Sequence, residues 1–211
     1  MSRFLFGLLV ATLFTAPVFG QGAAPALRQL RTDGYLLVAL PTRSNKVAAL
    51  QRALDRPDLD AEGEANLRAR LAQVQRDNDT DAEFLRLAFA QGYDFSPYRF
   101  TYDTVVVNLR NGVPDPGPLL DADFIPISEP VADGAYWVAQ LGSQEGRPGL
   151  RLRTARLEPP SGIEDFYRLH TLVSLFRSLT RPKASAALLD TQRMVERLDK
   201  ALYRAAGVAR E

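Results

Sequence analysis

Apolar positions along the chain follow two different spacings, and these predict alternating strands and helices. Residues 35–40 (Tyr-Leu-Leu-Val-Ala-Leu) form an unbroken apolar run with a proline directly after it, which is typical of a strand buried on both faces. Residues 46–55 then carry apolar side chains at helical spacing. A second helix is expected to begin near Asp58 or Asp60 and to continue to Gly92.

The next segment completes a β-α-α-β opening. Residues 98–108 are rich in aromatic and β-branched side chains, which predicts one bent strand or two short strands that stop at Asn111 and Gly112. Because the two helices separate this segment from the strand at 35–40, a right-handed crossover is expected to leave the two strands parallel. Residues 111–123 contain three prolines and are expected to form a loop.

The second half of the chain predicts shorter strands and a closing helix. Strands are expected at 124–127, 135–141 and 149–157, and the last two should pair as an antiparallel hairpin. The apolar run at 166–179 favours a helix, although a strand within it fits the pattern as well. A final amphipathic helix is expected to occupy 182–207.

These elements predict an α/β fold. We expect residues 21–211 to form a single domain with a mixed central sheet, a β-α-α-β opening, a later antiparallel hairpin and a C-terminal amphipathic helix. Residues 21–33 are either a leader or a short helix. The chain shows no internal repeat or change of composition that would mark a second domain.

Residues 1–20 have the pattern of a signal peptide. Arg3 supplies a positive charge, an apolar stretch follows, and Val18 and Gly20 are small enough for the positions before a cleavage site. The alternative is an uncleaved membrane anchor, but the apolar stretch is shorter than a spanning helix needs. The chain is therefore predicted to be exported to the periplasm or the cell exterior, with no membrane span after cleavage.

Composition and charge exclude several kinds of chemistry. The chain of 211 residues has no cysteine and one histidine, which rules out disulfides, zinc–thiolate sites and cysteine nucleophiles. Its 26 basic and 25 acidic residues show no imbalance that would indicate nucleic-acid binding. Arg3 is the single charged residue of the predicted signal peptide, so the remainder is formally neutral. We expect neither a metal nor a cofactor.

The turn after the first strand is a candidate anion site. It contains two cations and three hydroxyl or amide side chains: Thr42, Arg43, Ser44, Asn45 and Lys46. In open α/β sheets, ligands bind at the carboxyl ends of strands, and a helix N-terminus favours anions. The competing interpretation is ordinary helix capping by Ser44 or Asn45, because caps use the same residue types.

Four other patterns have simpler explanations. Residues 77–81 (Asp-Asn-Asp-Thr-Asp) resemble the start of a calcium loop but lack its later glycine and glutamate, so a solvated helix face is favoured. Arg147, Arg151, Arg153 and Arg156 suit the solvated face of an edge strand better than an acidic polymer or lipid. The aromatic residues of 93–102 suit a core.

His170 is the fourth pattern, because serines and acids lie near it in the sequence. The neighbours that would complete a hydrolase triad are Ser161, Ser174, Asp165 and Glu164. The chain has no Gly-x-Ser-x-Gly motif, and members of a triad need not be close in sequence. A hydrogen-bonded structural histidine is therefore the favoured interpretation.

Several segments together resemble a family of uncharacterised exported proteins of Bacteroidota-type bacteria. The matching stretches are 34–40 with Thr42 and Asn45, 88–102, 135–142 and the closing helix. Similar sequences carry a cysteine before the proline that matches Pro97, where this chain has Ser96. A thiol role therefore does not transfer, and the resemblance implies no activity, substrate or cofactor.

Two function classes follow from the sequence. The first is a non-enzymatic exported protein that binds an envelope protein or a small anionic ligand, with residues 42–46 as the candidate contact. The alternative is a hydrolase that uses carboxylate or serine chemistry. The sequence favours the first class because it carries no catalytic motif, but it does not identify the ligand or partner.

Overall fold

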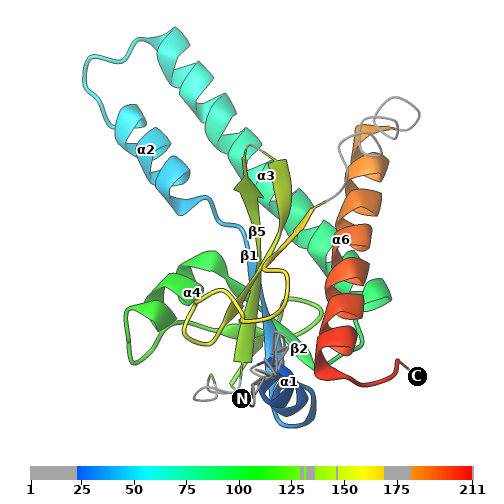
Figure 1. Ribbon diagram of the computed structural model, residues 1–211. Coiled ribbons are helices and arrows are strands. Elements are labelled where there is room, and N and C mark those ends of the chain that lie inside the picture. The colour runs from blue at the N-terminus through cyan, green and yellow to red at the C-terminus, as the bar shows by residue number, and fades with distance from the viewer. Residues whose placement is uncertain (1–22, 129–130, 132–135, 146, 169–181, 211) are drawn as a thin grey trace, which may run out of the picture.

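The computed structural model describes residues 23–128, 131, 136–145, 147–168 and 182–210, and it has an α/β architecture (Figure 1). The helices are α1 (Ala23–Thr32), α2 (Ser44–Leu54), α3 (Ala61–Gly92), α4 (Asp103–Arg110) and α6 (Lys183–Ala206). The strands are β1 (Tyr35–Leu40), β2 (Tyr98–Tyr102), β3 (Leu119–Leu120), β4 (Pro126–Ile127), β5 (Tyr136–Gln144), β6 (Arg147–Thr154) and β7 (Phe166–Arg168). The described residues therefore confirm the predicted fold class.

The strands form one mixed sheet with β1 at its centre. Their order is β4-β3-β2-β1-β5-β6-β7, and β1 is parallel to both β2 and β5. Five of the six residues of β1 are buried, as expected of a continuous apolar run that has helices over both of its faces. The parallel pairing of β1 with β2 confirms the prediction from the β-α-α-β opening.

The two faces of the sheet carry separate apolar cores. Leu36, Val38 and Leu40 of β1 pack in one cluster with residues of α1, α3 and α6. Leu37 and Ala39 point to the opposite face and pack in a smaller cluster with α4. This division follows from the alternation of side chains along a strand. The larger core is the one that supports the C-terminal helix, whose N-cap is Pro182 and whose C-cap is Gly207, as predicted.

The predicted antiparallel hairpin is present as β5 and β6. Gly142 pairs with Gly149 near its turn, and Trp137 pairs with Thr154 at its far end. Leu150 and Leu152 are buried while Arg151 and Arg153 are less so, which confirms the expected alternation. β7 then pairs with β6 through residues 166–168. The first residues of the 166–179 segment are thus a strand, and residues 169–181 lie outside the described part of the chain.

α2 and the first half of α3 form a helical hairpin that projects from the body of the protein (Figure 1). α2 contains no fully buried residue. The second half of α3 packs on the sheet and against α6, with Leu85, Ala88 and Phe89 in the larger core. One continuous helix of 32 residues therefore serves both the hairpin and the core.

The prediction for residues 103–108 was wrong. They are part of α4 rather than a strand, and Val105 and Val106 are buried while Val107 is exposed. Asp103 begins this helix, where a carboxylate is favourable near the N-terminal N–H groups. Packing of one helical face on β1 and β2 thus overrides the strand propensity of the valines.

Two shorter corrections concern the segment that follows. Residues 119–120, expected to lie in a loop, form β3, and only 126–127 of the expected strand at 124–127 are a strand. Phe124 has a φ of 62° and its ring packs at 5.0 Å from the ring of Phe100. This left-handed turn interrupts extended backbone and explains why the second strand begins later.

Among the described residues, no helix has the length and apolar character needed to cross a membrane.

Candidate ligand-binding site

The order in which the chain adds strands to the sheet reverses beside β1. After β1 the chain adds β2, β3 and β4 in turn on one side of β1, and it then adds β5, β6 and β7 on the other side. In open α/β sheets such a reversal leaves a crevice at the carboxyl ends of the two diverging strands. A cavity of about 690 Å³ lies at this position, where β1 and β5 end.

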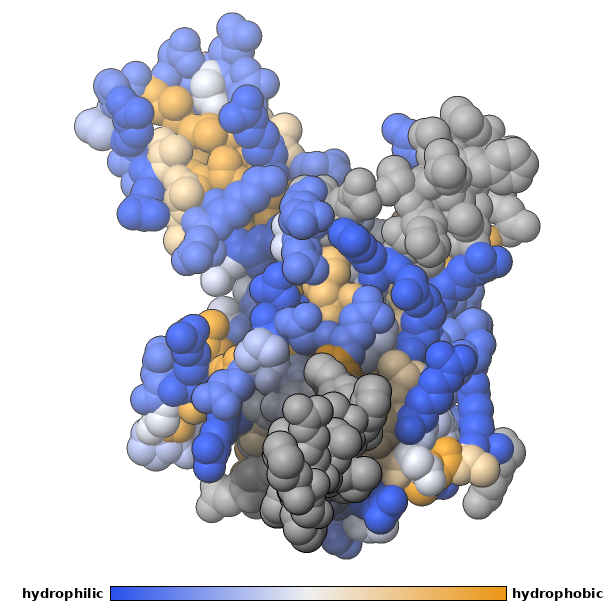
Figure 2. Space-filling view, in the orientation of Figure 1, coloured by the Kyte–Doolittle hydropathy of each residue, from blue (hydrophilic) through white to orange (hydrophobic). Residues whose placement is uncertain are grey.

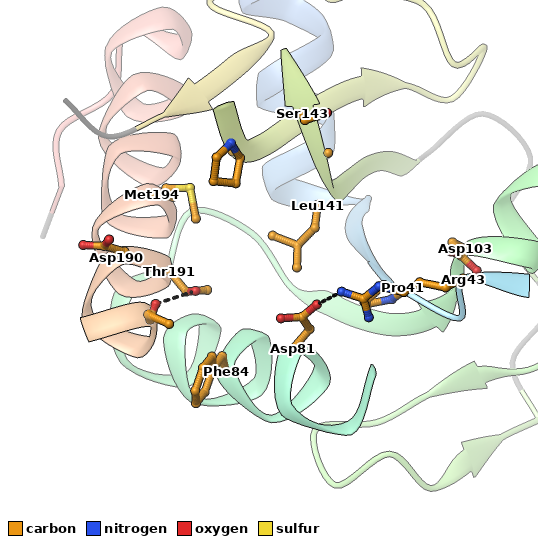
Figure 3. Close-up of a pocket in the computed structure, with 14 residues that line it drawn as sticks. Pro41, Arg43, Asp81, Phe84, Asp103, Leu141, Ser143, Asp190, Thr191 and Met194 are labelled. Atoms are coloured by element: carbon orange, nitrogen blue, oxygen red, sulfur yellow. Dashed lines mark hydrogen bonds and ion pairs between the residues drawn. The ribbon is translucent and has the colours of Figure 1, made fainter. Parts of the chain in front are cut away.

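The cavity is lined by both apolar and polar side chains, and the polar ones include one arginine and three aspartates. Leu141 of β5 and Met194 of α6 face one another across it, with Phe84 of α3 at its side (Figure 3). The remaining lining residues are Pro41, Arg43, Asp81, Asp103, Gly142, Ser143, Pro148, Gly149, Ala187, Asp190 and Thr191. Its volume falls within the range of small-molecule sites, and its lining is more polar than is usual for them.

Arg43 is held in position by two side chains of α3. Its guanidinium donates to the amide oxygen of Asn78 and to the carboxylate of Asp81, the latter at 2.6 Å (Figure 3). About a third of each side chain of the Arg43–Asp81 pair is exposed. Asn78 and Asp81 lie three positions apart on α3 and therefore on one face of that helix. The guanidinium is thus fixed in orientation and reachable from the cavity.

The backbone of Arg43 is left-handed, with φ 48° and ψ 36°. A residue other than glycine rarely adopts this conformation, and such residues are frequent at ligand sites. Arg43 is the N-cap of α2, and its side chain makes no capping hydrogen bond. The expectation that Ser44 or Asn45 caps this helix was therefore wrong, because the helix already begins at Ser44 and both residues lie in its first turn.

Thr42 connects the end of β1 to the start of α4. Its hydroxyl donates to one carboxylate oxygen of Asp103 at 2.6 Å, and its backbone N–H donates to the other at 3.1 Å. The carbonyl of Thr42 accepts a hydrogen bond from the side-chain amide of Asn78 at 2.8 Å. Thr42, directly before Arg43, is therefore held by two helices on opposite faces of the sheet.

The five predicted anion-site residues have different positions. Arg43 lines the cavity, and Thr42 is bound to Asp103 beside it. Ser44, Asn45 and Lys46 lie exposed in the first turn of α2 and are not among the cavity-lining residues. An anion site at 42–46 stays a prediction, and the structure places Arg43 as the residue of this group that reaches the cavity.

Sequence reasoning missed the residues that α3, β5 and α6 contribute to the cavity. Asp81 belongs to the acidic run that resembled a calcium loop, but this run is helical in the structure. The described residues contain no group of three or more histidine, cysteine or acidic side chains that could hold a metal ion. The spacing of Asn78 and Asp81 was the available signal, because it places an amide and a carboxylate on one helix face.

The other candidates are accounted for where they are described. Arg153 pairs with Asp165 at 2.7 Å, and Arg151 lies 5.6 Å from the ring centre of Phe166. Arg156 is exposed. The side chain of Arg147 and the whole of His170 lie outside the described part of the chain. The rings of Tyr93, Tyr98 and Phe100 pack around Phe89 in the core, as expected of the aromatic run, whereas Tyr102 at its end is exposed.

Comparison of the chain with protein-family models, with curated proteins and with solved structures found no match. The resemblance to exported proteins of Bacteroidota-type bacteria therefore stays a prediction.

Proposed function

We propose that this chain is an exported, non-enzymatic binding protein whose crevice holds a small organic anion with an apolar body. The observation that carries the proposal is the fixed guanidinium of Arg43 at the wall of a cavity that also exposes apolar side chains; the carboxylates of Asp81, Asp103 and Asp190 line it as well. The signal-peptide pattern of residues 1–20 supports the export part of the proposal.

Arg43 can bind an anion without releasing its partners. A guanidinium carries five N–H donors in a planar fork, so it can hold Asn78 and Asp81 and still donate to an incoming carboxylate. Its two partners keep the fork in one orientation, which lowers the entropy lost when a ligand binds. The left-handed backbone at Arg43 supports the same role, because such strain persists where surrounding contacts hold it.

The apolar interior selects the rest of the ligand. Phe84, Leu141 and Met194 offer an aromatic ring, a branched chain and a flexible thioether, which together suit an alkyl or aryl group. Asp81 and Asp103 are bound to Arg43 and Thr42, respectively, and this supports a positioning role for these carboxylates rather than catalysis. We therefore favour binding over the hydrolase alternative.

The test uses three eight-carbon probes that differ only in the head group: octanoate, octylamine and octan-1-ol. Octanoate should raise the thermal unfolding midpoint, by roughly 5–10 °C at a concentration about 100 times its Kd. Arg43→Gln should abolish this shift. Arg52→Gln changes an exposed arginine within α2, the helix that begins directly after Arg43, and should keep the shift. A shift with octylamine alone, or an equal octanoate shift in both variants, would contradict the proposal.

A second variant tests whether the cavity itself is occupied. Leu141→Trp fills the interior and should abolish octanoate binding measured by titration calorimetry, while Arg43 keeps its contacts. Acetate, which has the same charge and almost no apolar body, should bind much more weakly than octanoate to the unchanged protein. Equal affinity for the two acids would show that the apolar interior has no part in binding.

A further inference from the structure

The projecting hairpin leaves its apolar seam partly open. The helices α2 and α3 are in contact, and their apolar residues Val47, Leu50, Leu54, Leu67 and Leu71 are all half-buried rather than buried. Val74, nearer the body of the protein, is buried. Figure 2 shows apolar side chains along the hairpin, bordered by hydrophilic residues. Two helices alone cannot enclose an apolar stripe of this width, so the seam has room for further helices.

Charge on the hairpin is divided between its tip and its stem. The tip, residues 55–64, contains five acidic residues and one arginine. The stem, residues 44–54 and 65–76, contains five basic residues and no acidic one. The basic residues of the stem are Lys46, Arg52, Arg68, Arg70 and Arg76. The tip is therefore net negative and the stem net positive, and their net charges are of similar size.

We propose that this surface binds a second copy of the chain, with two hairpins side by side and antiparallel in a four-helix bundle. In this arrangement the acidic tip of each hairpin lies against the basic stem of its partner, and the two contacts are identical by two-fold symmetry. A parallel arrangement would place tip against tip and stem against stem, which like charges disfavour. The apolar seams face one another in the centre of the bundle.

The shape of the molecule permits this contact. α2 has 11 residues, so the bundle core extends over about 16 Å at the rise of an α-helix. The hairpin projects from the sheet (Figure 1), and an antiparallel pair therefore leaves the two bodies at opposite ends of the bundle. Ion pairs within one hairpin, such as Arg56–Asp58 and Arg68–Glu64, are exposed and easily exchanged for contacts with a partner.

The experiment is a charge swap followed by sedimentation equilibrium. A tip variant carries Asp55→Lys, Asp58→Lys and Glu62→Lys, and a stem variant carries Lys46→Glu, Arg68→Glu and Arg70→Glu. All six side chains are exposed, and each variant should keep the circular dichroism spectrum of the unchanged protein. The unchanged protein, as processed by the expressing bacterium, should be a dimer. Each variant alone should dissociate with a Kd roughly tenfold higher or more, because tip and stem then have the same sign.

An equimolar mixture of the two variants should dimerise again, because each tip then meets a stem of opposite sign. Reversal of Arg193, Lys200 and Arg204 to glutamate on α6 changes the same number of exposed charges elsewhere and should leave the dimer intact. A monomeric unchanged protein would overturn the proposal. So would dimers in both variants alone, or a mixture that stays monomeric, because folded chains with complementary hairpins would then have failed to associate.

Discussion

Asp199, in the C-terminal half of α6, accepts a hydrogen bond from the backbone N–H of Phe95 at 3.0 Å, across 104 positions of the chain. The same carboxylate oxygen accepts the N–H of Asp94, also at 3.0 Å. Asp199 is fully buried, and these two N–H groups belong to the turn between α3 and β2. One side chain of the C-terminal helix therefore fixes the entry of the chain into the second strand of the sheet.

Asp199→Ala should destabilise the protein by about 2–4 kcal/mol. The change leaves two backbone N–H groups without an acceptor, one of them at the buried Phe95, and also opens a small cavity. Asp199→Asn keeps an acceptor oxygen in nearly the same volume and should cost less. Urea unfolding monitored by circular dichroism gives both values. Equal losses for the two variants would show that the backbone hydrogen bonds are not the source of the effect.

Stability should also depend on pH through Asp199. Burial raises the pKa of this carboxyl above its ordinary value, and the negative charge of Asp94 raises it further, although the two N–H groups and Arg210 oppose the shift. Tyr93 and Tyr203 also face this group. A raised pKa in the folded state means that the folded chain binds the proton more tightly than the unfolded chain.

The stabilisation from this proton is therefore complete below the unfolded pKa of about 3.9 and is lost as the pH rises through the folded value. The unfolding free energy of the unchanged protein minus that of Asp199→Asn should therefore fall as the pH rises across this window, by at most about 1.4 kcal/mol per pH unit. Urea unfolding of both proteins between pH 3.5 and about 7 measures it. A difference that rises with pH would mean that Arg210 dominates the environment of Asp199.

The local pattern of apolar residues correctly predicted those elements in which it corresponds directly to the observed burial. The apolar run at 35–40 is β1, and the alternation at 149–157 gives the buried leucines of β6. It failed at 103–108, where three consecutive valines favour a strand but the packing of one face on the sheet produces α4. Sequence patterns report the preference of a segment, and tertiary contacts decide between preferences of similar strength.

The candidate site shows the same limit more strongly. Arg43 was predicted from its place after the first strand, which is a local property. Its partners Asn78 and Asp81 lie 35 and 38 positions away, and the sequence gives no measure of that proximity. The apolar residues of the cavity, Leu141 and Met194, look like ordinary core positions until the ends of β1 and β5 are placed beside α6.

Gly149→Ala should destabilise the protein, whereas the same change at its partner Gly142 should not. A Cβ atom at Gly149 would lie 2.5 Å from the ring of Phe166 and 2.9 Å from the backbone oxygen of Tyr167. The ring can move, but the oxygen belongs to β7, which is hydrogen-bonded to β6. The expected cost is about 1–3 kcal/mol, which lowers the unfolding midpoint by roughly 2–12 °C in a chain of this size.

Gly142 is the matched control because it pairs with Gly149 across the β5–β6 hairpin and also lines the cavity. A Cβ atom there meets nothing within 4 Å. Alanine also restricts the unfolded chain more than glycine does, so Gly142→Ala should leave stability unchanged or raise it by up to about 1 kcal/mol. Calorimetric scans of the two variants separate the explanations. If both lose stability equally, the hairpin needs glycine for its backbone conformation; if only Gly149→Ala does, close packing of β6 against β7 is the cause.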